Sequence, residues 1–339
     1  MVISLVRYKN KAMPKVSVII PVYNVEKYIE RCARSLFEQT LNDMEYIFVN
    51  DCTPDQSMQI LSSILTEYPN RLKQVLIINQ PSNTGQSGAR RRGMELATGD
   101  YIIHCDADDW VELDMYEKMY VNALETGADA VCCDIVLEFN NHHTHLKYNS
   151  KFPDHQLMYD CIAPISVEYY SMCNRLISKR IYDKYAIEPF SGVNMWDDVG
   201  LSIRFRYYIQ NNIVINESLY HYNRINETST TRRPVLERVN EQVVCVKELE
   251  KFFEKVGGKQ LYKRFISQIK LVAKEELFDF NPDLWRSTFS EVNRDISIVK
   301  QNCSKMRFFK YILVIYGGKF GVFLINMIRF MKHFTKRVL

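Results

Sequence analysis

Four short runs rich in β-branched and aromatic residues alternate with amphipathic stretches over the first 105 residues. The runs cover residues 16–21, 44–49, 75–78 and 101–105. Each of the first three is followed by a stretch with apolar residues at helical spacing, such as Tyr28, Ile29, Cys32, Ala33, Leu36 and Phe37. Strands that alternate with helices predict a parallel sheet joined by right-handed crossovers. We therefore predict a doubly wound α/β sheet.

Polar side chains gather where these predicted strands end. Tyr23, Asp51, Asn83 and Asp106 each follow one of the four strands. In a parallel α/β sheet, ligands bind outside the carboxyl ends of the strands. The four residues are therefore predicted to border one ligand site.

The fourth strand ends in a dense acidic sequence, Asp106-Ala107-Asp108-Asp109. In an extended chain Asp106 and Asp108 share a face, so both can reach one cation. Carboxylate oxygens suit Mg²⁺ or Mn²⁺, which in turn can bind the phosphates of a nucleotide. The alternative is a solvated acidic turn before a helix N-terminus, where Asp109 and Glu112 favour the helix dipole.

The β/α rhythm changes after a further predicted strand at 128–139. Residues 140–153 are polar and read as an exposed loop or hairpin, in which His142, His143 and His145 are interpreted as solvated side chains. A helix is predicted to open at Trp196-Asp197-Asp198, followed by a pair of strands near 213–215 and 219–222. From 234 to about 299 the apolar spacing is helical.

The tail differs in charge from the rest of the chain. Residues 301–339 contain eight Lys or Arg and no Asp or Glu, whereas the remainder holds 36 basic and 40 acidic residues. The body is therefore not expected to bind a polyanion such as nucleic acid. In the tail, Phe323, Leu324, Met327, Met331 and Phe334 share one helical face opposite basic residues, which favours an interfacial membrane helix over a spanning one. The alternative is that this stripe packs on the protein's own core or on a dimer partner.

Cysteine usage indicates the compartment. The nine cysteines show no C-x-x-C pairing, and many fall in predicted strands or helices. This pattern favours buried thiols in a reducing compartment over a disulfide framework. Residues 1–15 lack the features of a signal peptide, so a cytoplasmic protein is expected.

Several motifs appear in a characteristic order. They are Ser-Val-Ile-Ile-Pro-Val-Tyr-Asn at 17–24, Val-Asn-Asp-Cys-Thr-Pro-Asp at 49–55, Asn-Thr-Gly-Gln-Ser-Gly-Ala-Arg at 83–90, Asp-Ala-Asp-Asp at 106–109, Cys-Asn-Arg-Leu at 173–176 and Asp-Asp at 197–198. Over roughly 16–231 the chain resembles a family 2 glycosyltransferase of the GT-A fold and the bacterial polysaccharide type. The resemblance suggests a GT-A domain at 1–232, a helical appendage at 233–302 and a basic amphipathic tail at 303–339.

The resemblance also implies a function. It is the inverting, metal-dependent transfer of a sugar from a nucleotide-diphospho-sugar, by resemblance a UDP-sugar, to a hydroxyl of a glycan or lipid-linked acceptor at the inner face of the cell membrane. The implied donor contacts are Pro21, Tyr23, Asn24, Asp51, Asn83, Gly85, Arg90, Asp106, Ala107 and Asp108.

The resemblance assigns individual roles to these residues. Tyr23 would stack on the base, Asp51 would accept from the base imino group, and Arg90 would contact the diphosphate. Asp106 would hold the ribose or a metal, and Asp108 would hold Mn²⁺ or Mg²⁺. His221 is a further candidate for the metal or a phosphate; its alternative is a structural histidine.

An inverting displacement needs a base for the acceptor hydroxyl. Asp198 matches the family's Asp in a Glu-Asp pair and is the first choice, with Asp197 as the second; the alternative for both is a helix N-cap. The chain also departs from the family pattern. Cys52-Thr53-Pro54 replace Gly, Ser and Thr, which predicts a stiffer loop without a positive-φ position.

Two other functions are considered. The chain can be a non-catalytic nucleotide-sugar-binding partner of another transferase, in which Asp197 and Asp198 carry out no chemistry. A Rossmann dinucleotide enzyme is disfavoured because no G-x-G-x-x-G follows the first strand.

Overall fold

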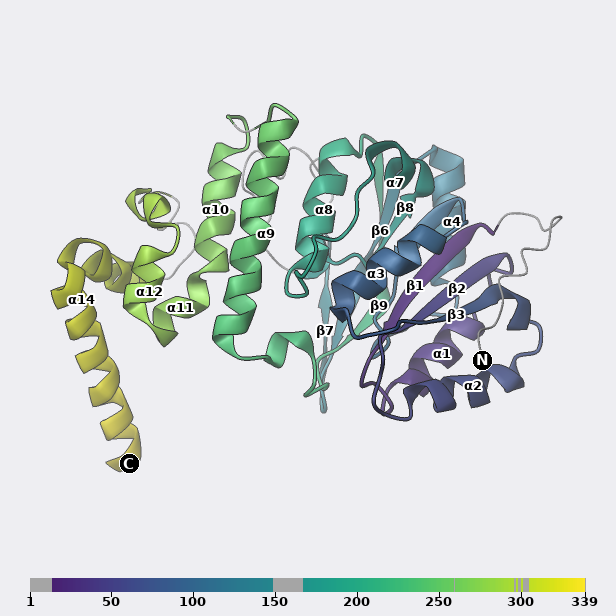
Figure 1. Cartoon of the computed structure of the whole chain (residues 1–339), viewed down its shortest axis with the longest axis horizontal. Coiled ribbons are helices and arrows are strands. Elements are labelled where there is room, and N and C mark those ends of the chain that lie inside the picture. The colour runs from purple at the N-terminus through teal and green to yellow at the C-terminus, as the bar shows by residue number, and fades with distance from the viewer. Residues whose placement is uncertain are drawn as a thin grey trace. The chain divides into compact units, whose positions relative to one another are not determined.

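The computed structural model describes residues 14–148, 167–258, 260–295, 297, 300 and 305–338. It divides into two compact units (Figure 1). The first contains the described residues of 1–154, 167–192 and 201–227; the second contains those of 193–200 and 228–339.

The first unit is built on a sheet whose leading half is parallel. Its strands are β1 (Val16–Val22), β2 (Met44–Asn50), β3 (Val75–Asn79) and β4 (Tyr101–His104). They pair in the order β3-β2-β1-β4, all in parallel. The connecting helices are α1 (Ile29–Phe37), α2 (Ser57–Glu67) and α3 (Gly85–Leu96), with a short 3-10 turn η1 (Leu72–Gln74) before β3. The four predicted strands and their crossovers are confirmed.

The other half of the sheet is mixed. Its strands are β5 (Trp110–Val111), β6 (Ala130–Glu138), β7 (His143–Leu146), β8 (Arg175–Ser178) and β9 (Asn212–Asn223). Antiparallel β8 joins β4 to β6, after which β9 and β5 follow, while β7 forms a hairpin with β6. The three hairpin histidines are exposed, as expected.

One prediction about this half is wrong. The expected strand pair at 213–215 and 219–222 is a single strand, β9, which runs parallel to β6 with shifts of register at Asp134. The register pairs Ile215 with Cys133, Ser218 with Asp134 and Tyr220 with Ile135, so residues 216, 217 and 219 are skipped at the irregularity. The strand therefore continues through a polar segment that looks like a turn in the sequence.

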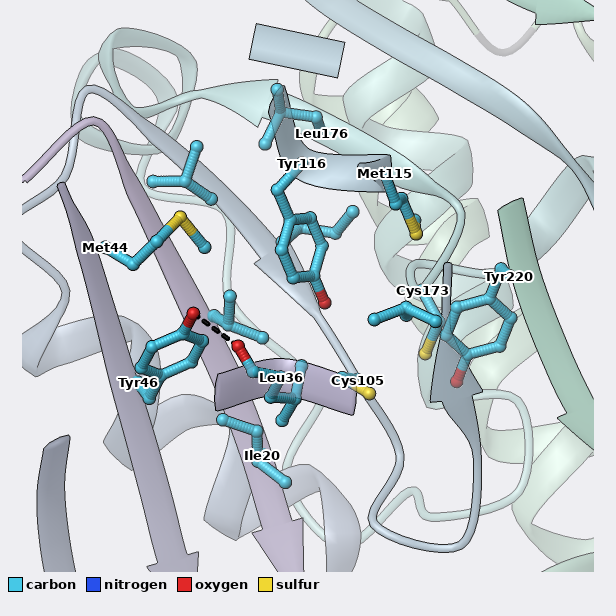
Figure 2. Close-up of a cluster of buried hydrophobic side chains, with 14 of the residues drawn as sticks. Ile20, Leu36, Met44, Tyr46, Cys105, Met115, Tyr116, Cys173, Leu176 and Tyr220 are labelled. Atoms are coloured by element: carbon cyan, nitrogen blue, oxygen red, sulfur yellow. Dashed lines mark hydrogen bonds between the residues drawn. The ribbon is translucent and has the colours of Figure 1, made fainter. Parts of the chain in front are cut away.

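Both faces of the sheet are covered. On one face, alternate residues of β1 and β2 pack with α1, α2 and α4 (Met115–Thr126). In this core the Tyr46 hydroxyl donates to the carbonyl oxygen of Leu36 at 2.5 Å, near Met44 and Tyr116 (Figure 2). On the other face, Ile19 and Ile47 pack with α3, α7 (Lys179–Tyr185) and residues of α8 (Asp197–Tyr208). Burial on both faces explains the near-continuous apolar runs.

The second unit is helical, as the apolar spacing predicts. Its elements are η2 (Thr230–Arg232), α9 (Val235–Lys255), α10 (Lys263–Ala273), α11 (Glu275–Phe280), α12 (Pro282–Ser287), η3 (Ser290–Arg294) and α14 (Lys305–Val338). Their core includes Trp285, Phe278 and Val239 together with Tyr311 and Val314 of α14. The first part of the tail is therefore an integral part of this core.

The described cysteines are free, and six of the seven are buried. This agrees with the expectation of buried thiols. The exception is Cys52, which is exposed in the loop after β2.

Candidate active site

Asp51 lies directly after β2 and is buried. One carboxylate oxygen accepts from the backbone N–H of Thr84 at 2.7 Å, and the other accepts from the N–H of Gly85 at 2.8 Å. Asp51 thus satisfies N–H groups at the start of α3 that have no partner within the helix. It ties the end of β2 to the α3 N-terminus, and any base contact would use its remaining lone pairs.

Two residues of the neighbouring loops adopt left-handed backbone conformations. Asn24 has φ 56° and Cys52 has φ 57°. The two loops are joined because the N–H of Asn24 donates to Thr53 Oγ1 at 2.7 Å. The expectation that Cys52 removes a positive-φ position is wrong, since the cysteine itself adopts that conformation at a steric cost. Beside this joint, the Tyr23 ring is 49% exposed and available for stacking.

Asp106 follows β4 and is held from α3. Arg90 Nη2 donates to Asp106 Oδ1 at 2.6 Å, and Gln86 Nε2 donates to the same oxygen at 3.1 Å. Arg90 is only 2% exposed, whereas Asp106 is 24% exposed. The buried guanidinium therefore balances the charge of Asp106, and its contact with a diphosphate stays a prediction.

Asp108 is held by the residues that follow β9. Asn226 Nδ2 donates to Asp108 Oδ2 at 2.7 Å, and Asn223 Nδ2 donates to its backbone carbonyl at 3.1 Å. Burial, and then the nearby charge of Asp106, raise the pKa of Asp108 to about 6, while the Asn226 hydrogen bond opposes this rise. A bound cation would relieve the crowding of these two carboxylates.

Asp109 is the innermost carboxyl group of the acidic turn. It accepts from the N–H of Asn223 at 2.7 Å and from the Tyr220 hydroxyl. Burial, and then the charge of Asp108, raise the pKa of Asp109 well above its ordinary value. Asp109 is therefore a buried carboxyl group whose hydrogen bonds connect the acidic turn to β9. It is not a solvated helix cap, as the alternative interpretation held.

His221 lies between two carboxylates. Its Nε2 lies 2.8 Å from Glu112 Oε1, and its Nδ1 lies 2.8 Å from Glu138 Oε1. Its ring stacks on Trp110, and the Arg31 guanidinium lies over the same Trp110 ring. These are the contacts of a structural histidine, and a metal or phosphate contact of His221 stays a prediction.

The remaining implied donor contacts lie around the same strand ends. Asn83 Oδ1 accepts from the N–H of Gly85 at 3.1 Å, and Gly85 has φ 75°, which glycine adopts without strain. Pro21 lies in β1 opposite Val49 of β2, and Ala107 is buried between the two acidic residues.

Asp197 and Asp198 open α8, as predicted, and belong to the second unit. The residue before them, Trp196, has φ 72°, an uncommon and strained conformation for a bulky side chain. Within this unit Glu241 Oε2 accepts from the N–H groups of Asn194 at 2.8 Å and Met195 at 2.6 Å.

Glu241 is itself held by Arg233, whose two terminal nitrogens bind its two oxygens at 2.8 and 2.9 Å. The segment that leads to the acidic pair is thus fixed from α9. Sequence reasoning missed Glu241, Asn223 and Asn226. For the two asparagines the signal is present, since they follow the predicted strand at 219–222, as the other site residues follow their strands, but this strand end is not among those used to predict the site.

The described residues contain no group of three His, Cys, Asp or Glu side chains placed to hold a metal ion. Asp106 and Asp108 are hard oxygen donors of the kind that Mn²⁺ and Mg²⁺ prefer. Two carboxylates fit such an ion if a bound diphosphate and water complete its coordination.

Residues 17–186, half of the chain, match the family model for glycosyl transferase family 2. The chain belongs to this family. The matched region contains β1 to β4, the acidic turn and Arg90, so the resemblance inferred from the motifs is confirmed.

Two relatives from Bacillus subtilis illustrate the similarity. The chain is 39% identical over 134 residues to the uncharacterized glycosyltransferase EpsJ, covering 40% of this chain and 38% of EpsJ. It is 30% identical over 228 residues to the putative glycosyltransferase EpsH, covering 65% of this chain and 63% of EpsH. The chain therefore matches less than two thirds of the length of either relative.

Solved structures show the same fold. TarS 1–349 of S. aureus in complex with UDP-GlcNAc superposes with a TM-score of 0.67 at 16% identity, over 89% of this chain and 88% of that chain. The mannosyltransferase PcManGT from Pyrobaculum calidifontis, in complex with GDP-Man and Mn²⁺, gives a TM-score of 0.54 at 13% identity, over 93% and 86% of the two chains. The predicted α/β GT-A fold is confirmed.

Proposed function

We propose that this member of glycosyl transferase family 2 transfers a sugar, with inversion, from a UDP-sugar to a hydroxyl of a glycan or lipid-linked acceptor in polysaccharide synthesis. The observation that carries the proposal is the acidic turn of Asp106 and Asp108 at the end of β4, in a chain that matches the family over this region. The UDP-GlcNAc bound to TarS, a protein of the same fold, supports a uridine nucleotide.

The donor's nucleotide is proposed to lie along the strand ends of the first unit. The exposed ring of Tyr23 would stack on the base, and Asp51 would accept from its imino N–H while it continues to cap α3. Asp106 is oriented by Arg90 and would bind the ribose or share the cation.

Asp108 and Asp106 are the residues that would hold Mn²⁺ or Mg²⁺. When bound, the ion neutralises charge on the departing diphosphate. The protein's own contribution is to fix these carboxylates before the donor arrives: Asn226 orients Asp108, and Asp109 anchors the turn to β9.

Asp198 is proposed as the base, with Asp197 as the second candidate. The carboxylate takes the proton of the acceptor hydroxyl while that oxygen bonds to the anomeric carbon from the face opposite the diphosphate. The bond from the anomeric carbon to the diphosphate breaks in the same step, and the configuration inverts. Glu241 would position this base by fixing the preceding backbone N–H groups.

The protein is proposed to work in the cytoplasm at the inner face of the cell membrane, where a lipid-linked acceptor is accessible. The basic composition of residues 301–339 supports this location.

Three variants of the full chain test the proposal. Donor binding is measured by calorimetry with UDP-sugars and Mn²⁺, and transfer is measured with a panel of acceptors. We expect Asp108→Asn to lose metal-dependent donor binding. Of Asp198→Asn and Asp197→Asn, the variant that removes the base should retain donor binding and lose transfer. Donor binding by the wild type with neither hydrolysis nor transfer on a broad acceptor panel would instead identify a non-catalytic partner of another transferase.

A further inference from the structure

The helix α14 contains a sharp corner. Gly318 has φ 54° and ψ −134°, which interrupts the helix. Three residues later, a Cβ on Gly321 would lie 1.8 Å from the carbonyl oxygen of Leu313. The chain after the corner therefore lies directly against the backbone before it, and this approach requires glycine.

One face of α14 is held by the second unit on both sides of the corner. Tyr311 and Val314 before it, and Val322 and Ile325 after it, are buried in the helical core. The Tyr311 ring stacks on Trp285 at 4.8 Å.

Polar contacts reinforce this packing before the corner. Arg307 pairs with Glu275 at 2.8 Å and with Asp279 at 2.5 Å. The corner is therefore anchored by an apolar core and by ion pairs, and its conformation is part of the folded unit.

Close to the corner in sequence are aromatic residues that do not enter this core. Tyr316, Phe320 and Phe323 are 69%, 67% and 61% exposed, and Lys319 between them is also exposed. We name these four residues the corner patch. The predicted apolar stripe includes Phe323, which is not packed on the protein's own core, whereas the buried positions Val322 and Ile325 belong to a different face. Exposed aromatic residues gathered at one turn are typical of an interaction surface.

We propose that the corner patch docks on an anionic lipid bilayer. Aromatic rings are favoured at the interface of a membrane, and a neighbouring lysine can approach lipid phosphates. The charge is complementary, since residues 301–339 carry eight Lys or Arg and no acidic residue. This inference deepens the proposed function by assigning the surface that brings the enzyme to a lipid-linked acceptor.

The same segment is not suited to crossing the bilayer. Lys305–Met327 has the length and hydropathy of a spanning helix. Its most apolar 18-residue stretch has a mean hydropathy of 1.6, and 28% of that stretch is buried in the protein. The helix before Gly318, however, reaches only about 20 Å at 1.5 Å per residue, short of a hydrocarbon core of about 30 Å. After Gly318, Lys319, Arg329 and Lys332 interrupt the apolar sequence.

Sedimentation of the full chain with lipid vesicles tests the proposal. We expect binding to phosphatidylcholine vesicles that contain phosphatidylglycerol, weaker binding at high salt, and little binding to pure phosphatidylcholine. The variant F320S/F323S should lower the partition onto anionic vesicles at least about 100-fold, because each ring contributes about tenfold or more. Lys319→Glu should lower it by about fivefold or more.

Leu261→Ser is the matched control, because Leu261 is a similarly exposed apolar residue (59%) of the same unit outside the patch. It should bind vesicles as the wild type does. Equal binding of F320S/F323S and wild type, or equal binding to neutral and anionic vesicles, would overturn the proposal. So would a wild-type dimer that binds no vesicles and becomes monomeric in F320S/F323S, since the patch would then cover a second copy of the chain.

Donor binding separates this inference from the proposed function. F320S/F323S should bind UDP and Mn²⁺ as the wild type does. A wild type that binds anionic vesicles through the patch but binds no nucleotide would leave the membrane surface in place and refute the glycosyltransferase proposal.

Discussion

The ion pair between Arg90 and Asp106 gives a quantitative test of how the acidic turn is supported. Arg90→Met removes the guanidinium and leaves Asp106 without its 2.6 Å partner. Two unit charges about 4 Å apart interact by about 4 kcal/mol at an effective dielectric constant of about 20. Breaking a buried pair costs about 3–5 kcal/mol. Because Asp106 is 24% exposed and retains some solvation, we expect a loss near the lower end, about 3 kcal/mol.

A double-mutant cycle isolates this interaction. Urea denaturation gives the free energies of unfolding of Arg90→Met, Asp106→Asn and the double variant. Each single variant leaves one charge unpaired, so the double variant should be more stable than the sum of the two losses predicts, with a coupling of about 3 kcal/mol.

A second pair on the same helix provides the control. Arg92 pairs with Glu95 at 2.7 Å, but both side chains are more than 40% exposed. Arg92→Met should therefore change stability by less than about 0.5 kcal/mol. A coupling free energy between Arg90 and Asp106 as small as that of an exposed pair would refute the view that Arg90 stabilises the acidic turn through its ion pair with Asp106.

Three further predictions concern the same loops. At pH 8 Asp108→Asn should raise the free energy of unfolding by about 2 kcal/mol and should abolish metal-dependent donor binding. The stability rises because the raised pKa of Asp108 makes its ionised form costly to the folded state above about pH 6. A variant that is less stable than the wild type and still binds donor with metal contradicts this. Asp109→Asn should remove a pH dependence. The folded state retains the proton of Asp109 above the unfolded pKa of about 4. The free energy of unfolding of the wild type should therefore fall relative to that of the variant as the pH rises, by up to about 1.4 kcal/mol per pH unit. If denaturation at several pH values gives the two proteins parallel curves of unfolding free energy against pH, the pKa of Asp109 is not raised. Cys52→Gly should stabilise the protein by about 0.5–1 kcal/mol because glycine adopts the φ of 57° without strain, whereas Cys52→Ala, which keeps the strain, should show no such gain in thermal denaturation.

The parallel half of the sheet could be predicted because β1, β2 and β4 are largely buried on both faces and therefore read as continuous apolar runs. The edge strand β3 is only half-buried, but its sequence is also apolar. The strands β5 and β8 have only two and four residues, too few for a periodic signal. The polar residues 216–218 predict a break between two strands, and only the pairing of β9 with β6 shows that the chain stays extended.

The rule that parallel strands end at a common edge predicts that Asp51, Asn83 and Asp106 lie near one another, and the structure has each of them after the end of its strand. Their contact with a ligand stays a prediction. Their partners could not be predicted. Arg90 pairs with Asp106 across 16 positions, and Asn226 pairs with Asp108 across 118, so both contacts depend on tertiary packing.

The partners of His221 could not be predicted either. Glu112 and Glu138 contact its two ring nitrogens from positions 109 and 83 residues away, so these contacts depend on tertiary packing. In the tail, helical periodicity identified an amphipathic segment, whereas the corner at Gly318 determines which of its faces is buried.

The donor site can be tested by calorimetric titration of the full chain with UDP, GDP, dTDP and their sugars, each with and without Mn²⁺. We expect a uridine nucleotide to bind, the binding to require the metal, and Asp108→Asn to abolish it. If no nucleoside diphosphate binds the folded wild-type chain, the acidic turn is a structural feature and not a donor site.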